Sequence, residues 1–560
     1  MTKNKKKSKG NGPSLSYQQP ATDTVTGTIK MHPRGFGFVV VDHPSPYSQD
    51  IFIPKHFTKN AVDGDTVEVA VNRDFISDKG PEGKVIAILS RGRTHIAGTI
   101  RAIDTHGQAI AYVPLLGSQQ KVLVESEERE LKVGDRIVMK IVEWGTSDTG
   151  TTSQFSHYIG NIADPSCDIP AAIEEYELPA DFSSKAVEEA EKWGSRVSEK
   201  DIQGREDLRN VTTFTIDPDT AKDFDDALSL QKEENGIYQL GVHIADVSHY
   251  VQMNSSLDKE AALRCNSTYF PGYCLPMLPG ALSENLCSLK PNVNRLTVSV
   301  LMRIDPEGNV VDYRIVRSVI KSAKRFTYKE AKKVLDGKKE SPHSFKLQQM
   351  VELCHLLKKK RYERGSIEFA LPELVIVVDK QGVPQGTEYI QYDITHQMVE
   401  EFMLKANELV ALALFQQGKN LTYRVHDQPA EENLRDFAFL ANAFGFSLPD
   451  YPSVQDLQQL FQNAEKTPYV NYLASNYIRR MRLAIYSAEN IGHYGLSLSH
   501  YCHFTSPIRR YIDLVVHRIL FGEKDDLTYL QEISQQCSDQ ERISAKAESS
   551  VIFLKKTPLT

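Results

Sequence analysis

The feature that most limits how this chain can fold is an internal repeat near its beginning. Gly27-Thr-Ile29 recurs as Gly98-Thr-Ile100, and Val62-Asp-Gly-Asp65 is matched by Lys132-Val-Gly-Asp135. Both pairs are offset by about 70 residues, and each unit contains short β-patterned segments separated by turn signals. This length and pattern predict two consecutive five-stranded OB-type barrels, a fold that often holds single-stranded nucleic acid.

The first repeat unit carries aromatic side chains in two strand-like segments. Arg34-Gly-Phe-Gly-Phe-Val39 and Asp50-Ile-Phe-Ile-Pro54 resemble the aromatic strands of cold-shock domains. Alternation places three residues where bases could stack, namely Phe36, Phe38 and Phe52. These rings could instead fill the barrel, but the intervening glycines leave the strand surface open, which favours stacking. The second unit has only Tyr112 at the matching place, so we expect it to bind nucleic acid more weakly.

A dense acidic stretch lies farther along the chain. Five carboxylates fall within ten residues, and these are Asp217, Asp219, Asp223, Asp225 and Asp226. Like charges this close raise one another's pKa, so the stretch either projects into water as an acidic turn or surrounds a cation. Its flanks, Val211–Ile216 and Gly241–Val247, have the pattern of buried strands. The carboxylates are therefore expected at a strand end inside a folded domain, which favours the cation.

The ligand chemistry of the acidic stretch favours a hard cation. Because the cluster contains no Cys or His, its ligands are all oxygens, which indicates Mg²⁺, or Mn²⁺ as a substitute, rather than zinc. A calcium-binding EF-hand does not fit. Counted from Asp217, it would need Gly and Glu where the chain has Lys222 and Leu228.

Two adjacent arginines mark a second informative stretch. Ser506 is a typical N-cap, the following proline a typical first helical residue and Gly522 a typical stop, so we predict a helix with Arg509 and Arg510 in its first turn. Cations are disfavoured at that end of a helix, so this pair requires an anion. A bound phosphate would supply one, and ion pairs with the fold's own acids, including Asp513, are the alternative.

These stretches together resemble the ribonuclease II/ribonuclease R (RNB) superfamily of processive 3′→5′ exoribonucleases. The pattern D-x5-D-x-D-D behind a strand is similar to the family signature. Other stretches occur in the family's order: Tyr269-Phe-Pro-Gly, Leu275-Pro-Met-Leu-Pro, Leu282-Ser-Glu-Asn-Leu-Cys-Ser-Leu289, Arg424-Val-His-Asp427 and His503-Phe-Thr-Ser-Pro-Ile-Arg-Arg-Tyr511. Ribonuclease R proteins carry an S1 RNA-binding domain after these motifs. We expect it to be absent, because the chain stops at Thr560.

The resemblance implies roles for individual residues. The metal-site acids would be Asp217, Asp223, Asp225 and Asp226, whereas Asp219 falls on a variable position. Arg509 would contact the phosphate being cut, Tyr269 would stack on a base beside it, and Glu548 would lie near the 3′-terminal nucleotide. The catalytic residues would then be Asp225, Arg509 and Glu548. His426 and Asp427 could equally be a structural pair and receive no catalytic role.

The activity implied by the resemblance is the hydrolysis of single-stranded RNA to 5′-nucleoside monophosphates with Mg²⁺ as cofactor. Two alternatives remain open at this point. A cold-shock-type RNA-binding protein would use the barrels alone and would be insensitive to EDTA. A catalytically impaired, truncated ribonuclease would keep every motif and release no nucleotides.

Composition and length set the remaining limits. The chain has 560 residues, 41% of them hydrophobic and 25% charged, which predicts a soluble globular protein of several domains. It contains no apolar run long enough to cross a membrane, and its seven scattered cysteines indicate reduced thiols. We therefore expect a cytoplasmic monomer without a membrane or disulfide-linked partner. A net charge of −7 does not exclude RNA binding, which needs only local positive potential.

The expected organisation has five segments. Residues 1–21 form a basic flexible arm, residues 22–90 and 91–160 form the two OB-type, cold-shock-like barrels, and residues 161–204 connect the barrels to the catalytic domain. This mixed α/β RNB domain occupies 205–560, with its core at about 205–525. Helices are expected at Ser184–Trp193, Thr327–Leu335 and Thr395–Gln417, and a strand at Leu296–Met302.

Overall fold

The computed structural model describes residues 22–32, 35–42, 46–47, 50–77, 80–117, 120–145, 149–369 and 371–556. The expected basic arm and Arg34 lie outside the described residues. The chain divides into two compact units, Met1–Glu177 and Leu178–Thr560, and each is described by itself.

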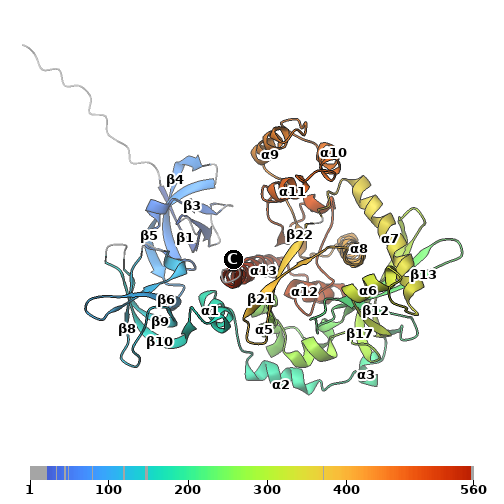
Figure 1. Ribbon diagram of the computed structural model, residues 1–560, viewed down its shortest axis with the longest axis horizontal. Coiled ribbons are helices and arrows are strands. Elements are labelled where there is room, and N and C mark those ends of the chain that lie inside the picture. The colour runs from blue at the N-terminus through green and yellow to red at the C-terminus, as the bar shows by residue number, and fades with distance from the viewer. Residues whose placement is uncertain are drawn as a thin grey trace, which may run out of the picture. The chain divides into compact units, whose positions relative to one another are not determined.

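The first unit contains two closed five-stranded barrels, which confirms the fold predicted from the repeat (Figure 1). The first barrel has the strand order β1-β2-β3-β5-β4 and is formed by β1 (Thr22–Met31), β2 (Gly37–Val41), β3 (Ile51–Ile53), β4 (Thr66–Ser77) and β5 (Gly80–Ser90). The second has the order β10-β8-β7-β6-β9 and is formed by β6 (His95–Ile103), β7 (Ala109–Tyr112), β8 (Val122–Glu125), β9 (Asp135–Glu143) and β10 (Thr151–Asn161). Helix α1 (Asp168–Glu175) comes after the second barrel.

The repeated residues form the same turn in both barrels. Gly64 and Gly134 adopt left-handed backbone with φ of 89° and 94°, which glycine accepts without strain. Their amides donate to a carbonyl of the first strand of their own barrel, at 2.9 and 2.8 Å. The next residues, Asp65 and Asp135, each accept from a backbone N–H three positions earlier at 2.9 Å. The repeat thus encodes the turn that leads into the fourth strand of each barrel.

The second unit is built on a seven-stranded sheet with the order β11-β18-β17-β14-β13-β12-β19. Its strands are β11 (Glu206–Asp207), β12 (Phe214–Asp217), β13 (Asp226–Lys232), β14 (Tyr238–Ala245), β17 (Asn294–Ile304), β18 (Val310–Lys321) and β19 (Lys324–Thr327). Neighbours are antiparallel except for the pairs β11–β18 and β12–β19. Three two-stranded sheets accompany it: β15 (Thr268–Phe270) with β16 (Tyr273–Leu275), β20 (Glu373–Val378) with β21 (Pro384–Ile390), and β22 (Tyr423–Val425) with β23 (Ile485–Ser487).

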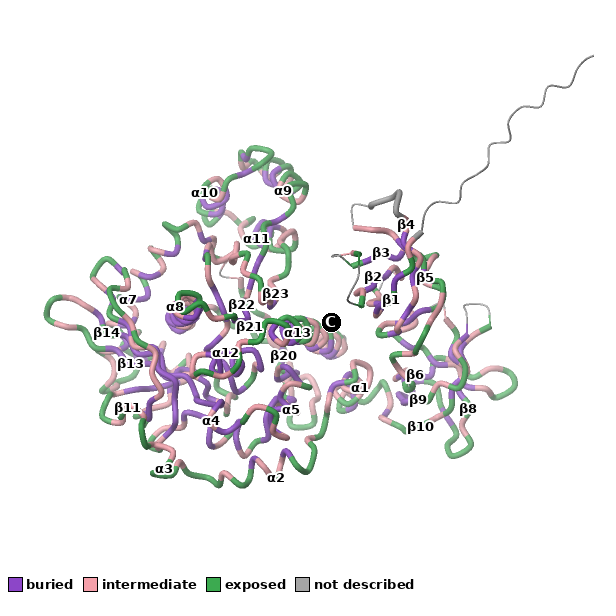
Figure 2. The backbone as a smooth tube through the Cα atoms, turned by 180° about the vertical axis from the view of Figure 1, so that it is seen from behind, coloured by how far each residue is buried: buried purple, intermediate pink, exposed green. Residues whose placement is uncertain are grey.

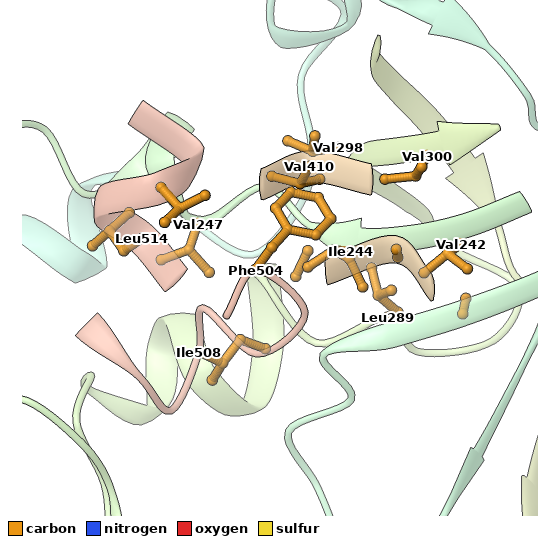
Figure 3. Packing of buried hydrophobic residues seen from close by; sticks show 14 of the residues in the cluster. Val242, Ile244, Val247, Leu289, Val298, Val300, Val410, Phe504, Ile508 and Leu514 are labelled. Carbon is orange, nitrogen blue, oxygen red and sulfur yellow. The ribbon is translucent and has the colours of Figure 1, made fainter. Parts of the chain in front are cut away.

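The helices of the second unit enclose a main core over this sheet and a second, smaller core. They are α2 (Ser184–Lys192), α3 (Glu199–Ile202), α4 (Val247–Tyr250), α5 (Ser256–Arg264), α6 (Tyr328–Leu335), α7 (Ser344–Arg364), α8 (Ile394–Gln416), α9 (Glu431–Ala443), α10 (Val454–Ala464), α11 (Val470–Ile478), α12 (Tyr511–Leu520) and α13 (Leu527–Lys556). Helices α6, α7 and α8 pack against β12, β13 and β14. Figure 2 shows the buried sheet strands in purple, and Figure 3 shows Phe504 between Val410 of α8 and Ile244 of β14. Helices α9, α10 and α11 enclose a separate small core. Among the described helices, none combines the length and apolar character needed to cross a membrane.

The predicted start of the last motif helix at Ser506 is wrong. Residues 507–509 form a turn, and helix α12 begins at Tyr511. Arg510 is extended, with φ of −135°, because it pairs in an isolated β-bridge with Asn266. Long-range pairing here overrides the local helix-start signal. The predicted end is confirmed, since Gly522 is left-handed directly after the C-cap residue Phe521.

Candidate active site

Four of the five clustered aspartates gather at one end of two neighbouring strands. Asp217 is the last residue of β12 and Asp226 the first residue of β13, while Asp223 and Asp225 lie in the loop that joins these strands. The side chains of Asp217 and Asp225 are buried, with 7% and 5% of their surface exposed. Asp219 instead is exposed and forms an ion pair with Lys329 at 3.0 Å. The structure therefore separates Asp219 from the other four.

Burial and mutual repulsion disfavour the charged forms of these acids. Burial, followed by the nearby charge of Asp226, raises the pKa of Asp217 to about 8. Burial also raises the pKa of Asp226 to about 6, and that of Asp225 well above its ordinary value despite the opposing charge of Arg509. The buried Oδ2 of Asp217 has no hydrogen-bond partner among the described residues. A divalent cation would supply the missing compensation.

The donor set fits a hard cation that retains part of its water shell. Among the described residues, no three acidic, histidine or cysteine side chains are already arranged as a metal-binding group. Asp225 accepts a hydrogen bond from the Ile508 amide at 2.9 Å, and Asp223 accepts one from the Tyr269 hydroxyl at 3.2 Å. Mg²⁺ commonly uses one or two carboxylates together with waters and substrate phosphates, a demand that the acids of this group of four can meet.

The two adjacent arginines have different environments. Arg510 is held by a two-point ion pair with Asp513, with its Nε 2.9 Å from Oδ2 and its Nη2 2.8 Å from Oδ1. Of the two alternatives left open by the sequence, the ion pair with Asp513 therefore holds for Arg510. The Arg509 side chain is 43% exposed, its Nε lies 3.5 Å from Oδ2 of Asp225, and its Nη2 donates to the Ser506 hydroxyl at 3.0 Å. Arg509 thus lies beside the acids and keeps exposed donors.

A short backbone ladder connects the turn of Arg509 with the strand that carries Tyr269. The Ser267 amide donates to the Arg509 carbonyl at 3.0 Å, and the Tyr511 amide donates to the Cys265 carbonyl at 2.8 Å. Tyr269 lies two residues farther along, in β15, with 38% of its surface exposed. Tyr269, Arg509 and the aspartates therefore border one site.

Glu548 lies on the side of the site occupied by β15. It is one helical turn beyond Ser544 in α13, and the Ser544 hydroxyl accepts from Thr268 at 2.9 Å, next to Tyr269. Burial and then the charge of Glu373 raise the pKa of Glu548. Among the described residues, no hydrogen bond or ion pair joins Glu548 to the aspartates, so it does not belong to their immediate cluster.

Two residues near the acids were not predicted from the sequence. Arg325 of β19 donates to the Pro218 carbonyl, and its charge opposes the rise in the pKa of Asp217. Burial and the charges of Asp226 and Asp217 raise the pKa of Tyr328, whose ring stacks on His396 at 3.9 Å. Strand β19 pairs in parallel with β12, which brings both residues to the acidic end of the sheet. The strand-like run before Tyr328 was the available signal, but its pairing partner could not be inferred.

The first barrel presents its phenylalanines on the surface. The rings of Phe36, Phe38 and Phe52 are partly exposed, with centroids 5.5 to 5.9 Å apart. Their neighbours along the same strands, Val39, Ile51 and Ile53, are fully buried. The three phenylalanines therefore form one outward aromatic face and do not fill the barrel. In the second barrel, the exposed aromatic at the matching place is Tyr112, with 38% of its surface exposed.

Comparison with known proteins decides the family. Residues 205–522 match the RNB domain, residues 27–88 the ribonuclease B OB domain and residues 117–183 a cold shock domain. Ribonuclease R from Chlamydia pneumoniae is 44% identical over 541 residues, which cover 95% of this chain and 80% of that protein. The chain belongs to the ribonuclease R family.

Solved structures of this family agree with the fold. Mycoplasma genitalium ribonuclease R in complex with ribose-methylated single-stranded RNA has a TM-score of 0.83 and 26% identity, with coverage of 96% of this chain and 86% of that one. The same enzyme in complex with double-stranded RNA has a TM-score of 0.79 and 28% identity, with coverage of 90% of each chain. Membership of the ribonuclease R family makes this chain an RNB-domain exoribonuclease with RNA as its substrate.

Proposed function

We propose that this exoribonuclease degrades single-stranded RNA processively from the 3′ end and releases 5′-nucleoside monophosphates, with Mg²⁺, or Mn²⁺ in its place, as cofactor. The observation that carries the proposal is the group of buried carboxylates with raised pKa values next to the exposed guanidinium of Arg509. Perturbed acids beside a free cationic donor are typical of sites for phosphoryl chemistry.

The acids would hold the cation and Arg509 would hold the phosphate. Asp217, Asp223, Asp225 and Asp226 would bind the metal, which when bound lowers the pKa of a water so that it can attack the terminal phosphodiester. Arg509 would donate to the phosphoryl oxygens and neutralise the charge that develops on them. The amide of Ile508 and the charge of Arg509 favour the ionised form of Asp225 and fix its direction.

Tyr269 and Glu548 would act on the end of the RNA. The half-exposed ring of Tyr269 can stack on a base, while its hydroxyl already donates to Asp223 at 3.2 Å. Base stacking of this kind contributes roughly 1–3 kcal/mol per base. Glu548, on the β15 side, would lie near the 3′-terminal nucleotide.

The aromatic face of the first barrel would bind incoming RNA. The rings of Phe36, Phe38 and Phe52 are close enough together to stack with successive bases, and such contacts tolerate any sequence. We further propose that the protein works as a monomer in the cytoplasm in RNA turnover and processing.

Two labelled RNAs test the direction and the product. With Mg²⁺, RNA labelled at its 3′ end should release labelled mononucleotide from the first time point, while RNA labelled at its 5′ end should shorten to a small resistant oligonucleotide. EDTA should stop both reactions. Excess unlabelled RNA added after the start should not interrupt molecules already being degraded. Early internal fragments, or labelled mononucleotide released first from the 5′ end, would contradict the proposal.

A further inference from the structure

One motif near the acids has no role in the proposed chemistry, and it contains a buried serine that contacts the acidic loop. Ser288 lies in the stretch Leu282–Leu289 and is completely buried. Its hydroxyl accepts a hydrogen bond from the Phe224 amide at 3.1 Å and donates one to the Lys222 carbonyl at 2.7 Å. These two peptide groups flank Asp223. The Ser288 hydroxyl therefore bridges the two peptide groups on either side of Asp223.

Ser288 is itself fixed from the sheet. Its carbonyl accepts from Nε of Arg295 at 2.8 Å, and Arg295 is a buried residue of β17. The next residue, Leu289, donates its amide to the Phe224 carbonyl at 3.0 Å, and its side chain lies in the core near Ile244 (Figure 3). The acidic loop is thus hydrogen-bonded to a segment that is itself held by Arg295 of β17.

We propose that Ser288 is a positioning residue that holds Asp223 ready for the divalent cation. This inference rests on the proposed function. Asp223 lies in the loop between β12 and β13 and not in a strand, and its carboxylate accepts a hydrogen bond from the hydroxyl of the exposed Tyr269 side chain at 3.2 Å. Partners that orient a ligand from outside the metal's direct contacts commonly change metal affinity by about 10- to 100-fold when removed.

A neighbouring serine provides a matched control. Ser283 is also buried, at 4% exposure, and its hydroxyl donates to the carbonyls of Leu278 and Pro279 at 3.1 and 3.3 Å. Among the described residues, none of its hydrogen bonds reaches the acidic loop. Ser288→Ala and Ser283→Ala therefore remove the same atom from the same motif, and only the first removes a contact around Asp223.

The experiment measures Mn²⁺ binding to the full chain after metal removal, from the electron paramagnetic resonance signal of free Mn²⁺. Ser288→Ala should weaken binding by about tenfold, and Ser283→Ala should leave it within about twofold. Ser288→Cys replaces the hydroxyl with a somewhat larger group that hydrogen-bonds only weakly, so it should weaken binding by about threefold or more without leaving the cavity that alanine would leave. At saturating Mn²⁺, kcat and KM for RNA should stay within about threefold of wild type in Ser288→Ala, because the serine acts through the metal ligand.

The outcomes separate this inference from the function on which it rests. Wild-type Mn²⁺ affinity in both Ser288 variants would overturn the positioning role, and so would an equal loss in Ser283→Ala. The proposed metal dependence itself would be overturned if the wild-type protein bound no Mn²⁺. It would also be overturned if Asp217→Asn left Mn²⁺ binding unchanged.

Discussion

Two regions of the molecule place side chains where they are costly, in opposite ways. The acidic end of the sheet buries charged groups, and the aromatic face of the first barrel exposes apolar ones. The sheet end buries carboxylates, with 7% of Asp217 and 5% of Asp225 exposed, whereas the barrel leaves the phenyl rings of Phe36, Phe38 and Phe52 partly in water. Burying charge and exposing apolar surface both oppose folding. In the proposed function, a partner offsets this cost in each region: a cation with phosphate at the sheet, and bases at the barrel. The first region should therefore govern the chemical step, and the second should govern binding.

The largest effect should come from Asp225→Asn. The change is nearly isosteric and removes one charge from the metal site, so kcat should fall by about 10²- to 10³-fold. RNA affinity should stay within a few-fold, because the aromatic face is unaltered. Single-turnover kinetics and filter binding measure the two quantities separately. Asp219→Asn is the matched control, since Asp219 is exposed and paired with Lys329, and it should stay near wild type. Near-normal turnover of Asp225→Asn at saturating Mg²⁺ would show that the site is misplaced.

Phe38→Ala should weaken RNA binding more than it lowers kcat, which is the reverse of the result expected for Asp225→Asn. Loss of one stacking ring should weaken RNA binding by about tenfold and leave kcat within about twofold, because the ring belongs to the first barrel and not to the acidic site. Tyr112→Ala in the second barrel is the matched control and should change binding by less than about twofold. Equal losses in the two variants would remove the distinction between the barrels.

Tyr269→Ala should have a smaller effect on rate than on the final product. Stacking matters most when the last nucleotides have no other contacts, so the resistant end product should lengthen while cutting of long RNA slows by only a few-fold. Denaturing gels of RNA labelled at its 5′ end report both. An end product of unchanged length would indicate that the ring only packs against its neighbours.

The smallest effect should be a pH-dependent change in thermal stability. Since the folded pKa of Asp217 is raised from 3.8 to about 8, its contribution to stability is fully present below its ordinary pKa and is lost as pH rises through about 8. A cation offsets this loss, so Mg²⁺ should raise the Tm more at pH 8.5 than at pH 6, by about 1–2 °C. Calorimetry with Mg²⁺ and with EDTA measures this difference. Asp217→Asn should abolish it, and a metal effect independent of pH in the wild-type protein would contradict the assignment.

Local signals predicted the parts of the structure that depend on local chemistry. The barrels follow from turns that Gly64 and Gly134 make possible, and the gathering of the acids follows from their position between β12 and β13. The extended conformation of Arg510 was not predictable, because its partner Asn266 lies far away in the sequence. The same holds for Ser288, which reaches the acidic loop from 64 positions away. The sequence thus pointed to the clustered acids and to Arg509, but not to Arg325 or to the neutral groups that contact the acidic loop.

The backbone ladder between residues 265–267 and the Arg509 turn has a consequence for how RNA could advance. Tyr269 is proposed to bind a base and Arg509 to bind a phosphate. Main-chain hydrogen bonds join the segments that carry these two residues, so we expect the segments to move together. We expect this coupling to favour RNA in which the spacing between base and phosphate is that of the natural linkage. RNA in which a 2′–5′ bond alters the spacing between base and phosphate would therefore fit Tyr269 and Arg509 less well. The length of each step along the RNA would then be set by the hydrogen bonds between the backbone of residues 265–267 and the Arg509 turn.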